Sequence, residues 1–481
     1  MCYPRAVSNP PGRTGAVQQS IDAVRKQYAE FGQEHVFRFW EALDPGARIA
    51  LLDQASRIDL AELRRVHEAT RVRTAPSERR LEPAPVECLP GHGGSAERRR
   101  EAKARGEALL REGRVATMVV AGGQGTRLGF EGPKGLFPLG PASGRTLFEL
   151  QAQKIRGARR RWHAPIPWYV MTSPATNAPT RAFFHEHRCF GLPESDVFFL
   201  CQATAPALDF EGRLLLETPG RIAENPNGHG GAFQALADSG ALDDMQRRGI
   251  TTLSYYQVDN PLIRLLDPVF VGVHAAAAAE MSAKVVRKID PMEKVGVLAR
   301  IDGRIGIVEY TEIDDAHRFA RDASGELVYW AGSIAIHLLE VDFVRRIAAD
   351  AERHLPYHAS AKKIPCTDAS GAPLRPTEPN GHKLERFLFD ALPFAARVSL
   401  LEVARDDEYA PVKNADGDDS PATARRALDR AARCWLAAAG ISVPQDAWIE
   451  VDHARIDGDD DARAGIARAE DAGVVTAPRT Q

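Results

Sequence analysis

The sequence predicts an α/β fold in which strands and helices alternate along the chain. Short apolar runs rich in β-branched or aromatic residues recur at 115–120, 167–171, 197–200 and 253–258. Stretches with helical spacing lie between them, as at 146–156 and 180–190. A glycine-rich segment follows the first run at once, as a loop follows a buried parallel strand. This alternation favours a largely parallel sheet flanked by helices.

Composition limits the class of protein before any motif is considered. The chain has 481 residues, enough for about three domains of ordinary size. Lys plus Arg is 62 and Asp plus Glu is 65, a net charge of −3, which argues against a nucleic-acid binder. The six cysteines form no CxxC pair, which excludes a disulfide framework and suits a reducing cytoplasm. No apolar run of 18 residues and no signal-like N-terminus occur, so we expect a cytoplasmic protein without a membrane segment.

Three segments follow from the patterning. Residues 1–96 read as a helical N-terminal region whose first 15 residues look disordered, with a connector at 74–96. Residues 97–415 carry the α/β pattern, beginning with a charged helix at 97–111. Residues 416–481 form a small C-terminal unit with a helix at 422–439 and a strand at 448–451.

Two acidic stretches lie in this last unit. They span residues 416–419 and 457–461. Neither has the glycine and glutamate spacing of an EF-hand, so we expect solvated loops.

The glycine-rich loop is the most informative segment. Ala121-Gly-Gly-Gln-Gly-Thr-Arg-Leu-Gly129 is followed by Pro133-Lys-Gly135. Glycines such as Gly122, Gly123 and Gly125 let a backbone approach phosphate closely, while Arg127 and Lys134 supply positive charge. The P-loop pattern is absent, and the spacing GxGxxxG differs from the dinucleotide fingerprint. The chemistry favours a polyanion such as a nucleoside triphosphate.

The loop begins a collinear series of motifs. It continues with Met171-Thr-Ser, Gln202, Gly228-His-Gly-Gly231, Val258-Asp-Asn260, Ile307-Val-Glu-Tyr-Thr-Glu312, Glu385-x-Phe387-x-Phe-Asp390 and Tyr409-Ala-Pro-Val-Lys-Asn414. The series resembles the eukaryotic-type UTP:sugar-1-phosphate uridylyltransferases, most of all the UDP-N-acetylhexosamine pyrophosphorylases. The resemblance implies a Rossmann-like, glycosyltransferase-A-like mixed sheet over the middle of the chain.

The resemblance also implies a reaction and a set of roles. UTP and a sugar 1-phosphate give a UDP-sugar and pyrophosphate with Mg²⁺, by direct in-line attack on the α-phosphorus and without a covalent enzyme intermediate. Gly122 and Gly123 would lie against uracil and ribose, with Gly125 in the same nucleotide loop. Gln202 and Gly228 would hold the base, Arg127 and Lys134 the UTP phosphates, Asp259 the Mg²⁺, Glu309 the sugar hydroxyls and Lys413 the sugar phosphate.

Structural explanations exist for several of these residues. Asp259 could cap a helix at Asp-Asn-Pro, Glu309 could be an outward strand residue, and Lys413 by itself could be a surface lysine. Among the functional alternatives, a related nucleotidyltransferase could use another base. A non-catalytic UDP-sugar binder would be expected to lack some of the charged residues of the site. The chain has all four of them: Arg127, Lys134, Asp259 and Lys413.

The sequence leaves open which sugar 1-phosphate is the substrate. Three residues depart from the acetylhexosamine pattern: His229 stands where Asn is usual, Ser333 replaces an Asn expected to touch the sugar, and Ile336 replaces a second Asn. Serine cannot reproduce the reach of an amide. N-acetylglucosamine 1-phosphate is favoured by overall similarity, and the alternative is a glucose or broad-specificity enzyme. The sequence does not indicate an oligomeric state.

Overall fold

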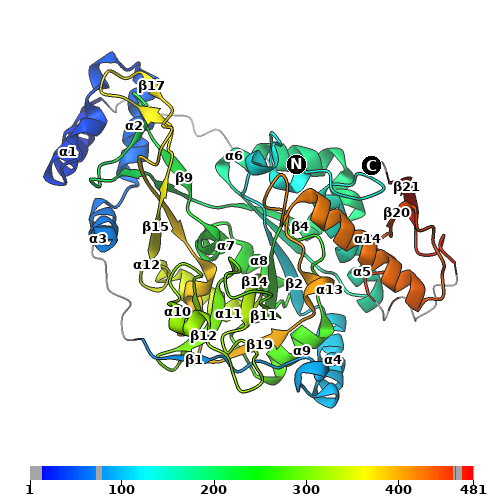
Figure 1. The fold of residues 1–481 in the computed structure, drawn as a ribbon. Helices are drawn as coiled ribbons and strands as arrows, with labels where there is room; N and C mark the ends of the chain where they lie inside the picture. The colour runs from blue at the N-terminus through cyan, green and yellow to red at the C-terminus, as the bar shows by residue number, and fades with distance from the viewer. Residues whose placement is uncertain (1–13, 72–78, 459–460, 462–467, 480–481) are drawn as a thin grey trace. The chain divides into compact units, whose positions relative to one another are not determined.

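The computed structural model describes residues 14–71, 79–458, 461 and 468–479. Most of the segment expected to be disordered, 1–15, lies outside these residues. Within them the chain forms two compact units, each discontinuous in sequence (Figure 1). Unit one comprises the described part of Met1–Ala75 with Thr204–Gly228 and Tyr357–Arg386, and unit two takes the rest. The linear division at residues 96 and 415 stays a prediction.

A ten-stranded mixed sheet forms the centre of unit two. Its main path runs β1-β12-β14-β10-β2-β3-β4, and β11, β13 and β19 pair beside it. The strands are β1 (Leu81–Pro83), β2 (Val115–Val120), β3 (Trp168–Thr172), β4 (Val197–Cys201), β10 (Thr252–Gln257), β11 (Met281–Arg287), β12 (Val297–Ile301), β13 (Arg304–Val308), β14 (Ala331–Glu340) and β19 (Val398–Glu402). β10, β2, β3 and β4 are parallel, whereas β14 is antiparallel to β10, β11 and β12. The mixed sheet implied by the resemblance is confirmed. The largely parallel sheet expected from the alternation of elements was wrong, because β12 and β14 pair antiparallel with their neighbours.

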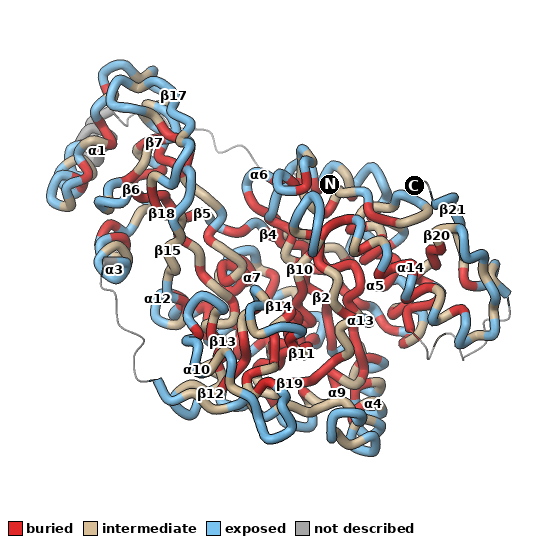
Figure 2. Tube along the Cα trace, viewed as in Figure 1, coloured by how far each residue is buried: buried red, intermediate tan, exposed pale blue. Residues whose placement is uncertain are grey.

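Helices cover both faces of this sheet because its strands are apolar on both sides. In β2, Val115 and Val119 enter one core cluster, whereas Ala116 and Met118 enter the other. The first cluster includes residues of α4 (Ala96–Arg111), α5 (Leu147–Trp162), α6 (Pro174–Glu186), α9 (Pro268–Ala276) and α14 (Pro421–Ala438). The second includes residues of α7 (Ala232–Asp238), α8 (Ala241–Arg247) and α11 (Val341–Ala348). Figure 2 shows the resulting buried band along β2, β10 and β14.

Unit one has its own smaller core. Its helices are α1 (Thr14–Glu30), α2 (Pro45–Ser56) and α3 (Leu60–Arg71), and its three-stranded sheet is β15 (Tyr357–Lys362), β18 (Gly381–Arg386) and β6 (Leu208–Asp209). Tyr28, Leu51, Leu208 and Leu384 belong to one buried cluster, so three separate stretches of sequence share this core. The helices expected between the first 15 residues and the connector of the N-terminal region are confirmed.

The predicted elements mostly match, with two corrections. The strands expected at 115–120, 167–171, 197–200 and 253–258 are β2, β3, β4 and β10 within one residue at each end. The helix expected at 180–190 was wrong in its bounds: α6 begins at Pro174, which follows the capping residue Ser173, and ends at Glu186. The segment 74–96, which we expected to be a connector, contains a strand, because Leu81–Pro83 pairs with β12.

The second acidic stretch is not a solvated loop at Asp457, and its residues 459 and 460 lie outside the described part of the chain. Asp457 is buried, its carboxylate lies 2.9 Å from the Lys154 ammonium of α5, and His453 contacts the same oxygen at 3.1 Å. The first stretch matches the expectation at Asp416 and Asp418, which are exposed. No helix among the described residues combines the length and hydropathy needed to span a bilayer.

Candidate active site

The glycine-rich loop follows β2 and contacts the residues that follow β3 and β4, Ser173 and Gln202. A Cβ at Gly122 would lie 2.6 Å from Nε2 of Gln202, so only glycine lets that amide rest against the backbone. The Ser173 hydroxyl donates to the Gly122 carbonyl at 2.8 Å, and the Lys134 amide donates to the Gly123 carbonyl at 3.0 Å. The loop therefore places Gln202 and Lys134 at its two sides.

The rest of the loop is a tight turn with an exposed cation. Gly125 lies under Phe130, whose Cδ1 would be 2.7 Å from an added Cβ, and Gly129 has a φ of +68°. Arg127, on the short helix Thr126–Leu128, is exposed, as is Gly123. Exposed backbone and guanidinium side by side suit a phosphate that approaches from solvent.

Asp259 follows β10 and meets Lys134. β2 and β10 are parallel neighbours, so the loops after them leave the same edge of the sheet. Oδ2 of Asp259 lies 3.4 Å from Nζ of Lys134, and the carboxylate residue is only 8% exposed. The Asp259 carbonyl also accepts a hydrogen bond from the Val412 amide at 2.9 Å. That bond brings the segment carrying Lys413 to the same edge.

Lys413 is held beside a phenol. Its Nζ donates to Oη of Tyr409 at 3.3 Å. Burial opposes the charge on Lys413, but the negative potential of Tyr409, Asp259 and Asp419 raises its pKa above the usual value. Asp419 has a φ of +53°, and its carbonyl accepts from the amides of Lys413 and Asn414. Lys413 is thus a fixed ammonium at neutral pH.

A buried cluster of charged residues lies next to the segment that leads to Lys413. Lys284 of β11 is 0% exposed at its side chain and contacts Glu408 at 2.6 Å and Asp267 at 3.0 Å. Asn260 donates to the Glu408 carbonyl at 2.7 Å and accepts from the Ala410 amide at 3.2 Å. These bonds tie the residue after Asp259 to the chain that leads to Lys413.

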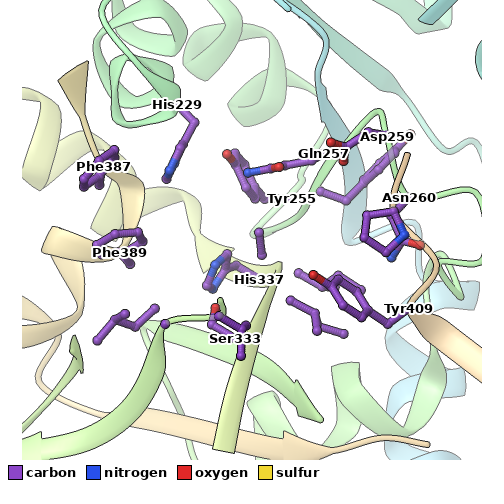
Figure 3. Close-up of a pocket in the computed structure, with 18 of the residues that line it drawn as sticks. His229, Tyr255, Gln257, Asp259, Asn260, Ser333, His337, Phe387, Phe389 and Tyr409 are labelled. Carbon is purple, nitrogen blue, oxygen red and sulfur yellow. The ribbon is translucent and has the colours of Figure 1, made fainter. Parts of the chain in front are cut away.

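A cavity of about 260 Å³ opens beside these groups. Several predicted residues line it: His229, Asp259, Glu309, Ser333 and Lys413. Ile336 lines it too. Figure 3 shows Asp259 and Tyr409 on one side of the cavity and His229, Phe387 and Phe389 on the other. The structure thus brings charged and polar residues from five separate stretches of sequence to one cavity.

A bulge in β14 shapes the wall of this cavity. Between the pairs Ser333–Val285 and His337–Ala283, β14 has three residues where β11 has one. Ala335, within the bulge, has a φ of +55°. Residues Ser333 to His337 therefore all line the cavity, which a regular strand with alternating faces would not allow.

Sequence reasoning gave no role to several lining residues. They are Tyr255, Gln257, Lys294, His337, Phe387 and Phe389. Phe387 stacks on His229 at 5.4 Å between ring centroids, and the Leu388 amide donates to Nδ1 of His229 at 3.1 Å. The Phe387-x-Phe389 pattern was visible in the sequence, but nothing local showed which way the rings point.

The remaining predicted residues lie outside the cavity lining. Gly122, Gly123, Gly125, Arg127, Lys134 and Gln202 form the loop region of unit two described above. Gly228 belongs to unit one, where its φ is +84° and an added Cβ would lie 2.5 Å from the Arg386 carbonyl oxygen.

Comparison with known proteins identifies relatives of the chain. The family described as UTP–glucose-1-phosphate uridylyltransferase matches residues 78–423. A UDP-N-acetylhexosamine pyrophosphorylase-like protein 1 of Xenopus tropicalis is 41% identical over 427 residues, which cover 85% of this chain and 83% of that protein. UDP-N-acetylglucosamine pyrophosphorylase of Saccharomyces cerevisiae is 35% identical, over 89% of this chain and 93% of that one. The crystal structure of the Trypanosoma brucei uridine diphosphate N-acetylglucosamine pyrophosphorylase has a TM-score of 0.76 and 31% identity, covering 88% and 87% of the two chains.

Proposed function

Because the chain belongs to the UTP–glucose-1-phosphate uridylyltransferase family, we propose that it is a uridylyltransferase making a UDP-sugar and pyrophosphate from UTP and a hexose 1-phosphate. The sugar phosphate we propose is N-acetylglucosamine 1-phosphate, the substrate type in the names of the yeast and trypanosome relatives. One observation carries the proposal: Lys413 and Asp259 line the same cavity as the polar residues His229, Glu309 and Ser333. A sugar and its phosphate would both be accommodated there.

The roles of the charged residues follow from their positions. Arg127 and Lys134 would bind the UTP phosphates and offset the charge that develops on the leaving pyrophosphate. Lys413 would hold the sugar phosphate so that its oxygen attacks the α-phosphorus in line. Gly122, Gly123, Gly125 and Gln202 would seat the nucleoside, and Glu309 would accept hydrogen bonds from sugar hydroxyls. A contact of Gly228 with the base stays a prediction.

The donor set around Asp259 fits Mg²⁺. Mg²⁺ prefers oxygen ligands and usually takes one or two carboxylates, completing its shell with substrate phosphates and water. Within the described residues Asp259 is not part of a group of three His, Cys, Asp or Glu side chains, so substrate oxygens would supply most of the shell. When bound, the ion would neutralise phosphate charge. A cytoplasmic location is likewise still a prediction.

A glucose 1-phosphate or broad-specificity enzyme is the second candidate. The observation that favours it is that His229, Ser333 and Ile336 all line the cavity. These are the three positions that depart from the acetylhexosamine pattern, so the departures lie where a sugar would bind.

Pyrophosphate release decides between these candidates. Purified protein would be mixed with UTP, Mg²⁺ and each of a panel of sugar 1-phosphates, with EDTA as the metal control. We expect metal-dependent release, fastest with N-acetylglucosamine 1-phosphate. Faster release with glucose 1-phosphate would favour the second candidate, and no release with any sugar phosphate would refute uridylyltransfer. Equal rates with ATP would refute uracil selection by Gln202.

A further inference from the structure

Three residues that line the cavity carry a buried polar atom without a hydrogen-bond partner: Tyr255, Tyr256 and His337. Tyr256 packs into the core cluster on the other face of the sheet, whereas Tyr255 and His337 are directly paired across β10 and β14. Nδ1 of His337 and Oη of Tyr255 are both buried and unpaired, and the two residues are 2% and 1% exposed. Both residues line the cavity. Buried polar groups are nearly always paired, so orphans beside a cavity indicate that a ligand completes them.

The His337 ring has one buried nitrogen available to a ligand. Nδ1 has no hydrogen-bond partner. In a neutral ring whose proton is on Nε2, Nδ1 is a hydrogen-bond acceptor. Burial, with the nearby His229 as a second cause, lowers the pKa of His337 to about 3. The acceptor thus stays unprotonated throughout the neutral pH range.

Tyr255 supplies the complementary donor. It lies directly opposite His337 in the antiparallel pair of β10 and β14, and the ring centroids are 5.8 Å apart. Burial raises the pKa of Tyr255, so its hydroxyl keeps its proton. A hydrogen-bond donor and an acceptor therefore stand side by side on one face of the sheet.

Their position separates two ends of the cavity. In Figure 3 they lie between the His229, Phe387 and Phe389 rings and the Asp259 and Tyr409 side. If Lys413 holds the phosphate of a sugar 1-phosphate, the sugar ring extends toward His337 and Tyr255. A sugar offers a donor beside an acceptor either as vicinal hydroxyls or as an acetamido N–H with a neighbouring oxygen.

We propose that Nδ1 of His337 accepts, and Oη of Tyr255 donates, a hydrogen bond to the sugar of the substrate, which makes both residues determinants of sugar specificity. This inference rests on the proposed function. His337 and Tyr255 would thus add two polar sugar contacts to those proposed for Glu309 and Ser333. The pair also offsets the missing amides at positions 333 and 336, because it provides hydrogen bonds from the neighbouring strand and from the end of the bulge.

The test compares sugar recognition with nucleotide recognition. Tyr255→Phe removes only the hydroxyl, His337→Leu removes the acceptor, and His337→Gln retains an amide acceptor. Calorimetry would measure the affinity of each variant for UDP-N-acetylglucosamine and for UDP. We expect a loss of about tenfold to a hundredfold for the UDP-sugar in Tyr255→Phe and His337→Leu, with partial rescue in His337→Gln. Affinity for UDP should not change.

A matched control removes a buried hydroxyl elsewhere. Tyr169 of β3 donates to Asp244 at 2.8 Å and does not line the cavity. Tyr169→Phe should lower the melting temperature without changing UDP-sugar affinity. If His337→Leu fails to fold, Tyr255→Phe and His337→Gln decide the question.

Turnover with three sugar phosphates locates the contact. Loss of kcat/KM with N-acetylglucosamine and glucose 1-phosphates, but not with 2-deoxyglucose 1-phosphate, would place it at carbon 2. Loss with all three would place it at another hydroxyl, and both results support the inference. Unchanged UDP-sugar affinity and kcat/KM in Tyr255→Phe and His337→Gln would overturn it. A wild-type protein that neither binds UDP-sugar nor releases pyrophosphate would instead overturn the proposed function.

Discussion

At the scale of single residues, the glycine-rich loop depends on the absence of a side chain at Gly122. Gly122 has no φ outside the range of other residues, and its constraint is the Gln202 amide that occupies the place of a Cβ. The end of the Gln202 side chain can move, so the fold would tolerate a methyl group at position 122. That methyl group would, however, push the Gln202 amide out of its present position.

Gly122→Ala is therefore expected to separate binding from stability. The added methyl would displace the Gln202 amide and raise KM for UTP about tenfold, the effect of one lost hydrogen bond. The melting temperature should stay within about 2 °C of wild type. Gly91→Ala is the matched control, because a Cβ there meets nothing within 4 Å. An unchanged KM for UTP would contradict the role proposed for Gln202.

Lys134 is the residue whose charge we expect to matter most for rate. The Lys134 amide bonds to the Gly123 carbonyl and its ammonium lies near Asp259, so the proposed contact with the phosphates would need little rearrangement. Lys134→Met should lower kcat by about a hundredfold to a thousandfold, the cost of one transition-state donor. Steady-state pyrophosphate release measures this. Lys26→Met, at an exposed lysine of α1, should leave kcat unchanged. A kcat within threefold of wild type would contradict the assignment.

At the scale of elements, strands β10, β11 and β14 act together on the site. β10 leads to Asp259, β14 supplies the bulge and His337, and β11 supplies Lys284 beneath Glu408. The cation of Lys284 is the one shared by Asp267 and Glu408. Burial opposes the charge of both carboxyls. The field of Lys284 lowers the pKa of Asp267, whereas the pKa of Glu408 remains raised.

Lys284→Met should therefore be destabilising. It would leave two carboxyls buried without their cation, which costs about 3–5 kcal/mol in the free energy of unfolding. Urea titration followed by circular dichroism measures the change. Arg57→Met is the control, since Arg57 pairs with Asp53 at 3.0 Å on the exposed surface of α2 and such pairs contribute under about 1 kcal/mol. Equal losses in the two variants would contradict the structural role of the cluster.

At the scale of the whole molecule, buried titratable groups make the stability of the fold depend on pH. Burial, with Lys154 second, lowers the pKa of His453. Burial opposes the charge of Asp457, but Lys154 and His453 more than offset it and hold that pKa below the usual value. Both groups bind protons less readily when folded, so the unfolded chain takes up more protons on acidification and stability falls.

We expect the melting temperature to fall in two stages as pH is lowered. The first begins near pH 6.5, where unfolded histidine protonates and buried His453 and His337 do not. The second begins near pH 4, as the stability that ionised Asp457 contributes is lost. Differential scanning calorimetry from pH 8 to 3 measures both. His453→Gln should flatten the first stage, and a curve identical to wild type would contradict the assignment.

The local structure and the family were predictable from sequence because they depend on neighbouring residues. Apolar runs of strand length predicted β2, β3, β4 and β10, and the glycine-rich loop with its collinear motifs indicated the family that the comparisons confirm. Where local signals were weak, prediction was wrong: the strand at 81–83 lay in a segment rich in proline and charge.

The sequence by itself determined most of the elements, the glycine-rich loop and the charged residues Asp259, Lys134 and Lys413 as candidates for a site. Only the tertiary structure decided that β14 runs antiparallel to β10, that His337 stands directly opposite Tyr255, and that Asp457 is buried against Lys154. These contacts join residues about 80 to just over 300 positions apart in the chain. Periodicity records which face of an element is apolar, but not which distant face it packs against, because that choice depends on how all the side chains fill one core.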